Sequence, residues 1–164
     1  MLRQTAHFFS VMIVAMSVLA SSAMASGCYT KSEAEAEQGI RIHSELMVIG
    51  LNCSHLMTAQ GENLYVKYRA WTKTHQDIFA GYEDTLMFYF SRNGVKSPES
   101  KLNTLRTTFA NKISLEAAKM RPDVFCQHYG GRIERAAGLN DRQIRDWAST
   151  FYASHPVSNP ICTR

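Results

Sequence analysis

Two Cys-x-His pairs are the residues whose type and spacing most directly suggest chemistry. Cys53 and His55 lie in LNCSHL, and Cys126 and His128 lie in FCQHYG. Zinc sites of the Cys2His2 type use Cys-x2–4-Cys and His-x3–5-His spacings, and neither is present here. On a helix, residues i and i+2 also point about 200° apart, so one pair cannot face one ion. The pattern therefore favours disulfide cysteines, and we predict no metal site.

The first 25 residues have the pattern of an export signal. Arg3 supplies the positive charge, HFFSVMIVAMSVLA the apolar stretch, and AMA, ending at Ala25, the small-x-small cleavage site. The apolar stretch is shorter than the roughly 20 residues of a transmembrane helix. We therefore expect cleavage after Ala25 and a periplasmic or secreted protein with one domain, residues 26–164, and no transmembrane segment. Lipoprotein processing at Cys28, in ASGC, is the alternative.

All four cysteines lie beyond the predicted cleavage site, and an even number in a small exported protein predicts two disulfides. In an up-and-down bundle, the end of the first helix and the start of the fourth lie at the same end. This topology predicts a Cys53–Cys126 bond and leaves Cys28 and Cys162 to join the two termini. If the C-terminal tail instead stays where the last helix ends, on the Cys53 side, Cys53 pairs with Cys162 and Cys28 with Cys126.

Helix signals recur along the chain, and no run of alternating strand pattern is present. We predict an all-α, disulfide-stapled bundle of four to five helices. The first helix begins with a capping box of Ser32 and Glu35, and Gly61 is a plausible stop. The second covers about residues 63–90, the third about 98–120, and the fourth starts at Pro122 and can break at GGR. The fifth begins with Asn140 as its cap.

Apolar residues recur in steps of three and four in the second and third predicted helices. The second has Leu64, Tyr68, Trp71, His75, Ile78, Tyr82, Leu86 and Tyr89, and the third has Leu102, Leu105, Phe109, Ile113 and Met120. The first helix contains IRIHSELMVIGL, which is apolar on nearly every side, so we expect it at the centre of the bundle. Gly39 and Gly50 fall on one line of that helix, where a neighbouring helix can approach closely.

His43 and His75 are the candidate ligand-binding residues, because both fall on faces that we expect to be buried. They could bind a ligand or metal, or act as acid and base, or simply form hydrogen bonds inside the core. The chain has no G-x-S-x-G motif, no C-x-x-C-H haem attachment motif and no phosphate-binding loop. We therefore predict no catalytic residue and no cofactor.

The most suggestive surface feature is a basic face on the third predicted helix. Lys101, Lys112 and Lys119 fall within about 20° of one another on a helical wheel. The pairs Arg132 with Arg135 and Arg142 with Arg145 add cations at one-turn spacing. Either these charges are simply solvated, or they bind an envelope protein or an anionic envelope component. The net charge is too small to suggest nucleic acid.

The leader, together with EAEQGIRIHSELMVIGLNC and FCQHYGG, resembles small exported helical proteins of unknown function from Gram-negative, especially alphaproteobacterial, envelopes. The resemblance implies a periplasmic location and transfers no site residue. From the sequence we predict a non-enzymatic periplasmic or envelope accessory or binding protein with a basic interaction face. The alternative is a small-ligand or metal carrier that uses the bundle interior around His43 and His75, and an enzyme of another type is the third hypothesis.

Overall fold

Seven α-helices account for most of the chain in the computed structural model, which describes residues 27–58 and 60–163. They are α1 (Lys31–Asn52), α2 (Leu64–Thr74), α3 (Gln76–Arg92), α4 (Pro98–Ala118), α5 (Pro122–Tyr129), α6 (Gly131–Ala137) and α7 (Asp141–Ala148). Only isolated bridges, and no strands, occur in the described part of the chain. The predicted all-α bundle stapled by disulfides is therefore confirmed. The predicted leader, residues 1–25, lies outside the described residues.

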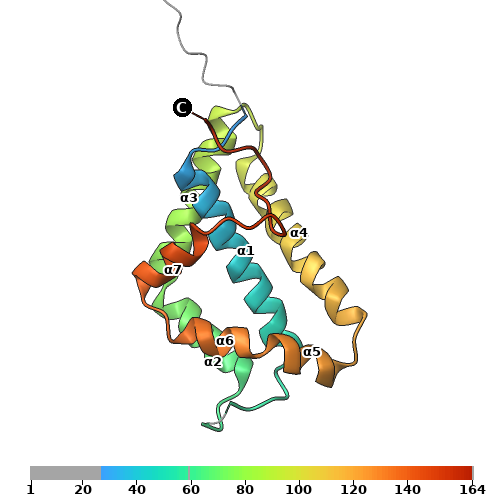
Figure 1. The fold of residues 1–164 in the computed structure, drawn as a ribbon. Coiled ribbons are helices and arrows are strands. Elements are labelled where there is room, and N and C mark those ends of the chain that lie inside the picture. The colour runs from blue at the N-terminus through green and yellow to red at the C-terminus, as the bar shows by residue number, and fades with distance from the viewer. Residues whose placement is uncertain (1–26, 59, 164) are drawn as a thin grey trace, which may run out of the picture.

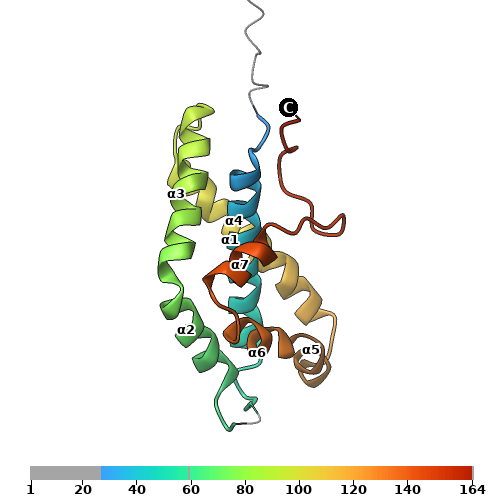
Figure 2. The ribbon, with the colours of Figure 1, turned by 60° about the vertical axis from the view of Figure 1, so that its left-hand side comes forward.

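Helix α1 lies at the centre of the bundle, as its apolar residues on nearly every side predict. It contacts all six other helices. Helices α2 and α3 run along one side of it and α4 along another, while α5 and α6 cross near its C-terminal end (Figures 1 and 2). Helix α7 packs beside the N-terminal half of α1, where Ser149, its C-cap, donates a hydrogen bond to Glu35.

Two of the five predicted helices are interrupted. The predicted helix 63–90 is two helices, because the backbone departs from helical geometry at His75 (φ −110°, ψ 23°). All eight residues of its apolar stripe are nevertheless buried, so the spacing continues through the break and could not reveal it. The fourth predicted helix breaks at Gly130, within the expected region, into α5 and α6.

The start and end of α1 differ from the prediction. The capping box is formed by Thr30 and Glu33, two residues before the expected pair. Glu35 instead contacts α3 and the end of α7, where it accepts hydrogen bonds from the hydroxyls of Tyr82 at 2.9 Å and Ser149 at 3.1 Å. The helix ends at Asn52, well before Gly61, and the next residue, Cys53, is tied to α5 by a disulfide.

Gly39 allows the close approach that its spacing with Gly50 predicts, whereas the contact at Gly50 is of ordinary van der Waals length. A Cβ atom at Gly39 would lie 2.2 Å from the Cε2 atom of Tyr82, well inside van der Waals contact. A Cβ atom at Gly50 would lie 3.4 Å from the Cβ of Tyr68. Helix α3 can therefore pack directly on the backbone of α1 at Gly39.

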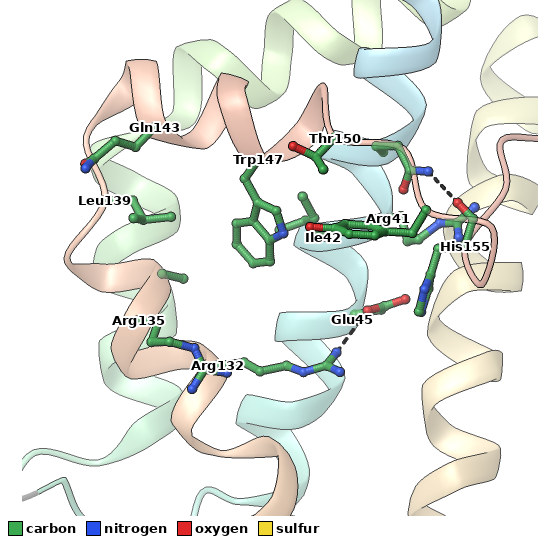
Figure 3. Close-up of a pocket in the computed structure, with 13 residues that line it drawn as sticks. Arg41, Ile42, Glu45, Arg132, Arg135, Leu139, Gln143, Trp147, Thr150 and His155 are labelled. Atoms are coloured by element: carbon green, nitrogen blue, oxygen red, sulfur yellow. Dashed lines mark hydrogen bonds and ion pairs between the residues drawn. The ribbon is translucent and has the colours of Figure 1, made fainter. Parts of the chain in front are cut away.

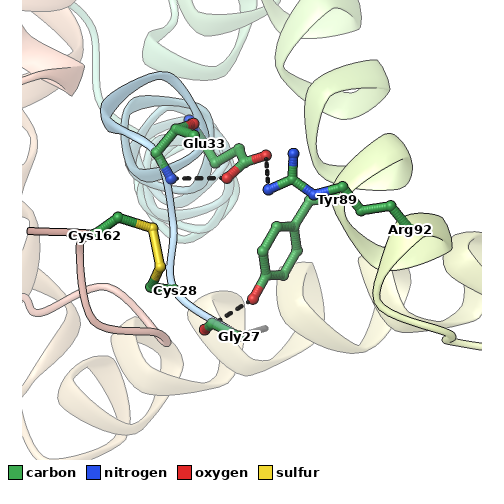
Figure 4. The surroundings of a disulfide bond; sticks show 7 residues. Gly27, Cys28, Glu33, Tyr89, Arg92 and Cys162 are labelled. Carbon is green, nitrogen blue, oxygen red and sulfur yellow. Dashed lines mark hydrogen bonds and ion pairs between the residues drawn. A yellow bond between two sulfur atoms is a disulfide. The ribbon is translucent and has the colours of Figure 1, made fainter. Parts of the chain in front are cut away.

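The disulfides have the predicted pairing. Cys53 is bonded to Cys126, with Cα atoms 5.5 Å apart, and Cys28 to Cys162, with Cα atoms 5.2 Å apart. The second bond joins the two ends of the described chain, close to the ion pair of Glu33 with Arg92 (Figure 4). A lipidated Cys28 would have no sulfur free for this bond, which argues against the lipoprotein alternative.

The C-terminal segment, residues 150–162, returns along α1 to reach Cys28 (Figure 1). We expected the last helix to end on the Cys53 side of the bundle. That expectation is wrong, since the short helices α6 and α7 turn the chain so that α7 ends near Glu35. The segment then runs beside α1, and its Ile161 forms an isolated parallel bridge with Tyr29.

Polar side chains of α1 hold this segment in place. Gln38 Nε2 donates to the carbonyl of His155 at 2.6 Å, and Arg41 donates to the carbonyl of Pro156 at 2.6 Å. The carboxylate of Glu37 accepts hydrogen bonds from the backbone N–H and the hydroxyl of Ser158. The three side chains of α1 are buried, so these contacts fix the segment that closes the site described next.

Candidate functional site

His43 lies in an aromatic cluster between α1, α2 and α3. Its Nε2 atom is 3.1 Å from the hydroxyl of Tyr68, and its ring centroid is 4.7 Å from that of Phe79. Burial, with a smaller effect from the Arg106 guanidinium, lowers the pKa of His43 to about 4. The imidazole is therefore neutral at neutral pH and forms a hydrogen bond inside the bundle.

His75 occupies the break between α2 and α3. Its Nδ1 atom lies 2.6 Å from a carboxylate oxygen of Asp141, the first residue of α7. The rings of Trp71 and Phe79, with centroids 5.1 Å apart, connect the neighbourhoods of the two histidines. His75 and His43 thus belong to one run of packed rings, and His75 also ties the α2–α3 break to the start of α7.

The three lysines of the predicted basic face are exposed on or just beyond α4. Lys119 caps the end of that helix, and its ammonium is paired with Glu116 at 2.8 Å. Lys101 and Lys112 have no carboxylate within ion-pair distance among the described residues. The cysteines of the opening motif are bonded to each other, and the described residues contain no group of three His, Cys, Asp or Glu side chains that could hold a metal ion.

A cavity of about 530 Å³, which we call the arginine cavity, lies between α1, α6, α7 and the C-terminal segment (Figure 3). Its thirteen lining residues are Gln38, Arg41, Ile42, Glu45, Arg132, Arg135, Ala136, Leu139, Gln143, Trp147, Thr150, Tyr152 and His155. Neither candidate histidine is among them.

One wall of the arginine cavity is a face of α1 in which polar residues flank Ile42. Arg41 is 6 % exposed, donates to the Pro156 carbonyl, and lies 3.8 Å from a carboxylate oxygen of Glu37. Burial lowers the pKa of its guanidinium, whereas Glu37 and Glu45 raise it. Its flat face covers the ring of Phe109, at 4.6 Å from the centroid. Arg41 is therefore a fixed charge with a defined orientation.

The opposite wall comes from α6 and α7. Helix α6 contributes Arg132 and Arg135, one turn apart, and α7 contributes Trp147, whose indole extends toward the cavity (Figure 3). Arg132 lies 3.5 Å from the carboxylate of Glu45 across the cavity. Arg135 is exposed and has no carboxylate within ion-pair distance in the described part of the chain. Its guanidinium is therefore available to a ligand.

The C-terminal segment forms the remaining wall, through Thr150, Tyr152 and His155. Burial lowers the pKa of His155, and Glu45 raises it. Three cations add to the lowering, namely Lys112, Arg41 and Arg132. The imidazole is thus surrounded mostly by positive charge and is neutral at neutral pH. Lys112, one lysine of the predicted basic face, lies close enough to lower the pKa of this cavity residue.

The sequence indicated only part of this site. The one-turn spacing of Arg132 and Arg135 marked a cationic pair, which the structure places on the cavity wall. Arg41 gave no such signal, because it lies within the apolar run of α1. Trp147 could have been found only by knowing where α7 packs, and His155 only by knowing that the C-terminal segment folds back over α1.

Comparison of this chain with protein-family models, with curated protein sequences and with solved structures finds no match. Among the described residues, no helix is long and apolar enough to cross a membrane. Two disulfides are typical of proteins that fold outside the reducing cytoplasm. Function must therefore be inferred from the arginine cavity and the charged surface.

Proposed function

We propose that the protein is a non-enzymatic binding protein of the periplasm that holds a small ligand in the arginine cavity. The observation that carries the proposal is the cavity itself, whose volume of about 530 Å³ falls within the range of roughly 300–1,000 Å³ typical of small-molecule sites. The two disulfides and the export-like pattern of residues 1–25 support a location outside the cytoplasm.

The composition of the lining favours binding. Small-molecule sites combine apolar and aromatic walls with a few polar groups that orient the ligand. Here Trp147, Leu139 and Ile42 supply apolar surface, while guanidinium and amide groups supply the polar contacts. Arg41 is held by a hydrogen bond to the Pro156 carbonyl, by an ion pair with Glu37 and by ring packing, so this part of the site is ordered before any ligand arrives.

Native mass spectrometry of the protein purified from its own host tests this proposal. We expect a non-covalent adduct of small-molecule mass on the wild-type protein. Leu139→Trp, which fills the cavity from its half-buried rim, should abolish the adduct. The matched control is Leu115→Trp, at a residue of α4 that is 62 % exposed and outside the cavity. Absence of an adduct on the wild type, or an equal adduct on Leu139→Trp, would contradict the proposal.

A second candidate function is binding of an anionic envelope partner through α4. The observation that favours it is the exposure of Lys101 and Lys112 without a carboxylate partner among the described residues. Glutamate at both positions should weaken retention on anionic vesicles, and added salt should weaken retention of the wild type. Charge reversal at Lys119, which is already paired with Glu116, should have less effect. Retention unaffected by any of these changes would show ordinary solvated charge.

Ligand or metal carriage around His43 and His75 stays a prediction from the sequence. The geometry supports it less than the arginine cavity, because Tyr68, Trp71 and Phe79 pack against the two imidazoles. Replacing His43 by glutamine and repeating the adduct measurement separates the two sites. Loss of the adduct in that variant alone would favour the histidines.

A further inference from the structure

The charges around the arginine cavity are unbalanced. Three guanidinium groups line it, from Arg41, Arg132 and Arg135, against the single carboxylate of Glu45. Beneath the wall, Glu37 partly offsets the charge of Arg41, at 3.8 Å. The remaining excess of positive charge favours an anion over a neutral or cationic ligand.

The guanidinium groups differ in their availability. Arg41 donates to the Pro156 carbonyl, and Arg132 shares the Glu45 carboxylate at 3.5 Å. Arg135 has no carboxylate within ion-pair distance in the described ranges. A guanidinium presents paired N–H groups that match the geometry of a carboxylate or phosphate. We therefore expect the carboxylate or phosphate of a ligand to bind Arg135, with Arg132 one turn away as a second contact.

The apolar part of the cavity lies next to these cations. The Trp147 indole extends from α7 into the space above Arg132 and Arg135 (Figure 3). Leu139, in the turn between α6 and α7, and Ile42, on α1, add aliphatic surface. A flat ring system packs well on an indole, so a ligand with a planar apolar body would fill the space beside its charged group.

We propose that the arginine cavity binds an organic anion that joins a planar apolar body to a carboxylate or phosphate group. The anionic group binds Arg135 and Arg132, and the apolar body packs against Trp147. This inference rests on the proposed function, since it names the ligand class of the same site.

Isothermal titration calorimetry with three probes of the same ring system tests the ligand class. The probes are 2-naphthoate, neutral 2-naphthylmethanol and cationic 2-naphthylmethylamine. We expect naphthoate to bind at least about tenfold more tightly than the alcohol, since one charge-assisted contact contributes about that factor. The amine should show no binding, and added salt should weaken naphthoate binding.

Two glutamine substitutions locate the charge contact. Arg135→Gln should weaken naphthoate binding about tenfold and leave the alcohol unchanged. The matched control is Arg142→Gln, at an α7 arginine that does not line the cavity and whose side chain is 91 % exposed. Circular dichroism checks that both variants remain helical. Equal naphthoate affinity in wild type and Arg135→Gln overturns the proposed contact.

The outcomes separate the ligand class from the proposed function. Equal affinity for naphthoate and the alcohol overturns the anionic class. Absence of naphthoate binding overturns the class as well. In either case, a host-derived adduct that Leu139→Trp removes keeps the binding function. Naphthoate binding that persists in Leu139→Trp places the probe outside the cavity and overturns the inference.

Discussion

Glu37→Gln tests whether a buried carboxylate of α1 holds the C-terminal segment. Glu37 is fully buried, and its Oε2 atom accepts a hydrogen bond from the Tyr29 hydroxyl at 2.7 Å. Its Oε1 atom accepts hydrogen bonds from the backbone N–H and hydroxyl of Ser158, at 2.7 and 2.9 Å, and lies 3.8 Å from the Arg41 guanidinium. Glutamine has nearly the same size and retains one oxygen, so the substitution removes the charge with little change in packing.

The expected loss of stability follows from these contacts. The glutamine oxygen can still accept from Ser158, but both of those bonds weaken without the negative charge. The charge-assisted bond from Tyr29 is lost, and such bonds contribute about 1.5–3 kcal/mol. Arg41, whose side chain is 7 % exposed, also loses its counter-ion, and breaking a buried ion pair costs about 3–5 kcal/mol. Because Arg41 keeps its bond to the Pro156 carbonyl, we expect a loss of about 3 kcal/mol in the free energy of unfolding.

Urea denaturation with both disulfides oxidised measures this loss. The matched control is Glu62→Gln, which removes a carboxylate paired with Lys67 at 3.3 Å near the surface and should cost no more than about 1 kcal/mol. Hydrogen exchange at the Ser158 amide should accelerate in Glu37→Gln more than exchange in the core helices. Equal free energies for the two variants, or unchanged exchange at Ser158, would refute the reasoning.

Three further predictions follow from the glycine packing, the buried imidazole and the terminal disulfide. Gly39→Ala should lower the free energy of unfolding by about 1–3 kcal/mol, because the added Cβ would overlap the ring of Tyr82. Gly81→Ala, whose Cβ would lie in open space, should instead stabilise α3. Thermal unfolding of both variants measures the difference. Burial lowers the pKa of His43 to about 4, so the free energy of unfolding should fall by about 3 kcal/mol as the pH falls from 6.5 to 4. Urea unfolding at a series of pH values measures this loss, and His43→Gln should lack it. The Cys28–Cys162 bond closes a loop between residues 134 positions apart and so restricts the unfolded chain. Replacing both cysteines by serine should therefore lower the free energy of unfolding in urea by about 3–5 kcal/mol, and a loss below about 1 kcal/mol would contradict this reasoning.

The fold class and the Cys53–Cys126 bond could be predicted from helix signals, whereas the Cys28–Cys162 bond depended on the path of the C-terminal tail, for which the sequence left two alternatives open. Steps of three and four residues identify a buried helix face whatever the helix packs against, and every residue of the predicted stripe from Leu64 to Tyr89 is buried. The up-and-down order of the first three helices brings Cys53 and Cys126 to one end of the bundle. Helix lengths and turn positions are sufficient for that conclusion, and side-chain detail is not needed.

The interruption at His75 could not be predicted from the same signals. The apolar spacing continues through it, and a histidine neither breaks nor favours a helix strongly. The imidazole there is bonded to Asp141, 66 residues later in the chain, and that contact depends on where α7 packs. Thr30 and Glu33 form the capping box rather than Ser32 and Glu35, and Glu35 instead accepts hydrogen bonds from Tyr82 and Ser149, which are distant in the sequence.

The buried polar residues of α1 show which part of the site sequence reasoning can still recover. A helix that is apolar on nearly every side is expected to be buried, so an arginine or glutamate within it must find a partner to offset its desolvation. Arg41 and Glu37 meet this requirement through the Pro156 carbonyl and Ser158, which are 115 and 121 residues away. Every residue carries a backbone carbonyl, so the sequence does not show which one will accept from Arg41. The need of a buried charge for a partner can therefore be predicted, but the identity of the partner cannot. The segment that supplies these partners also forms one wall of the arginine cavity. Two buried charges of α1, Arg41 within the apolar run and Glu37 just before it, therefore hold the segment that forms this wall of the proposed binding site.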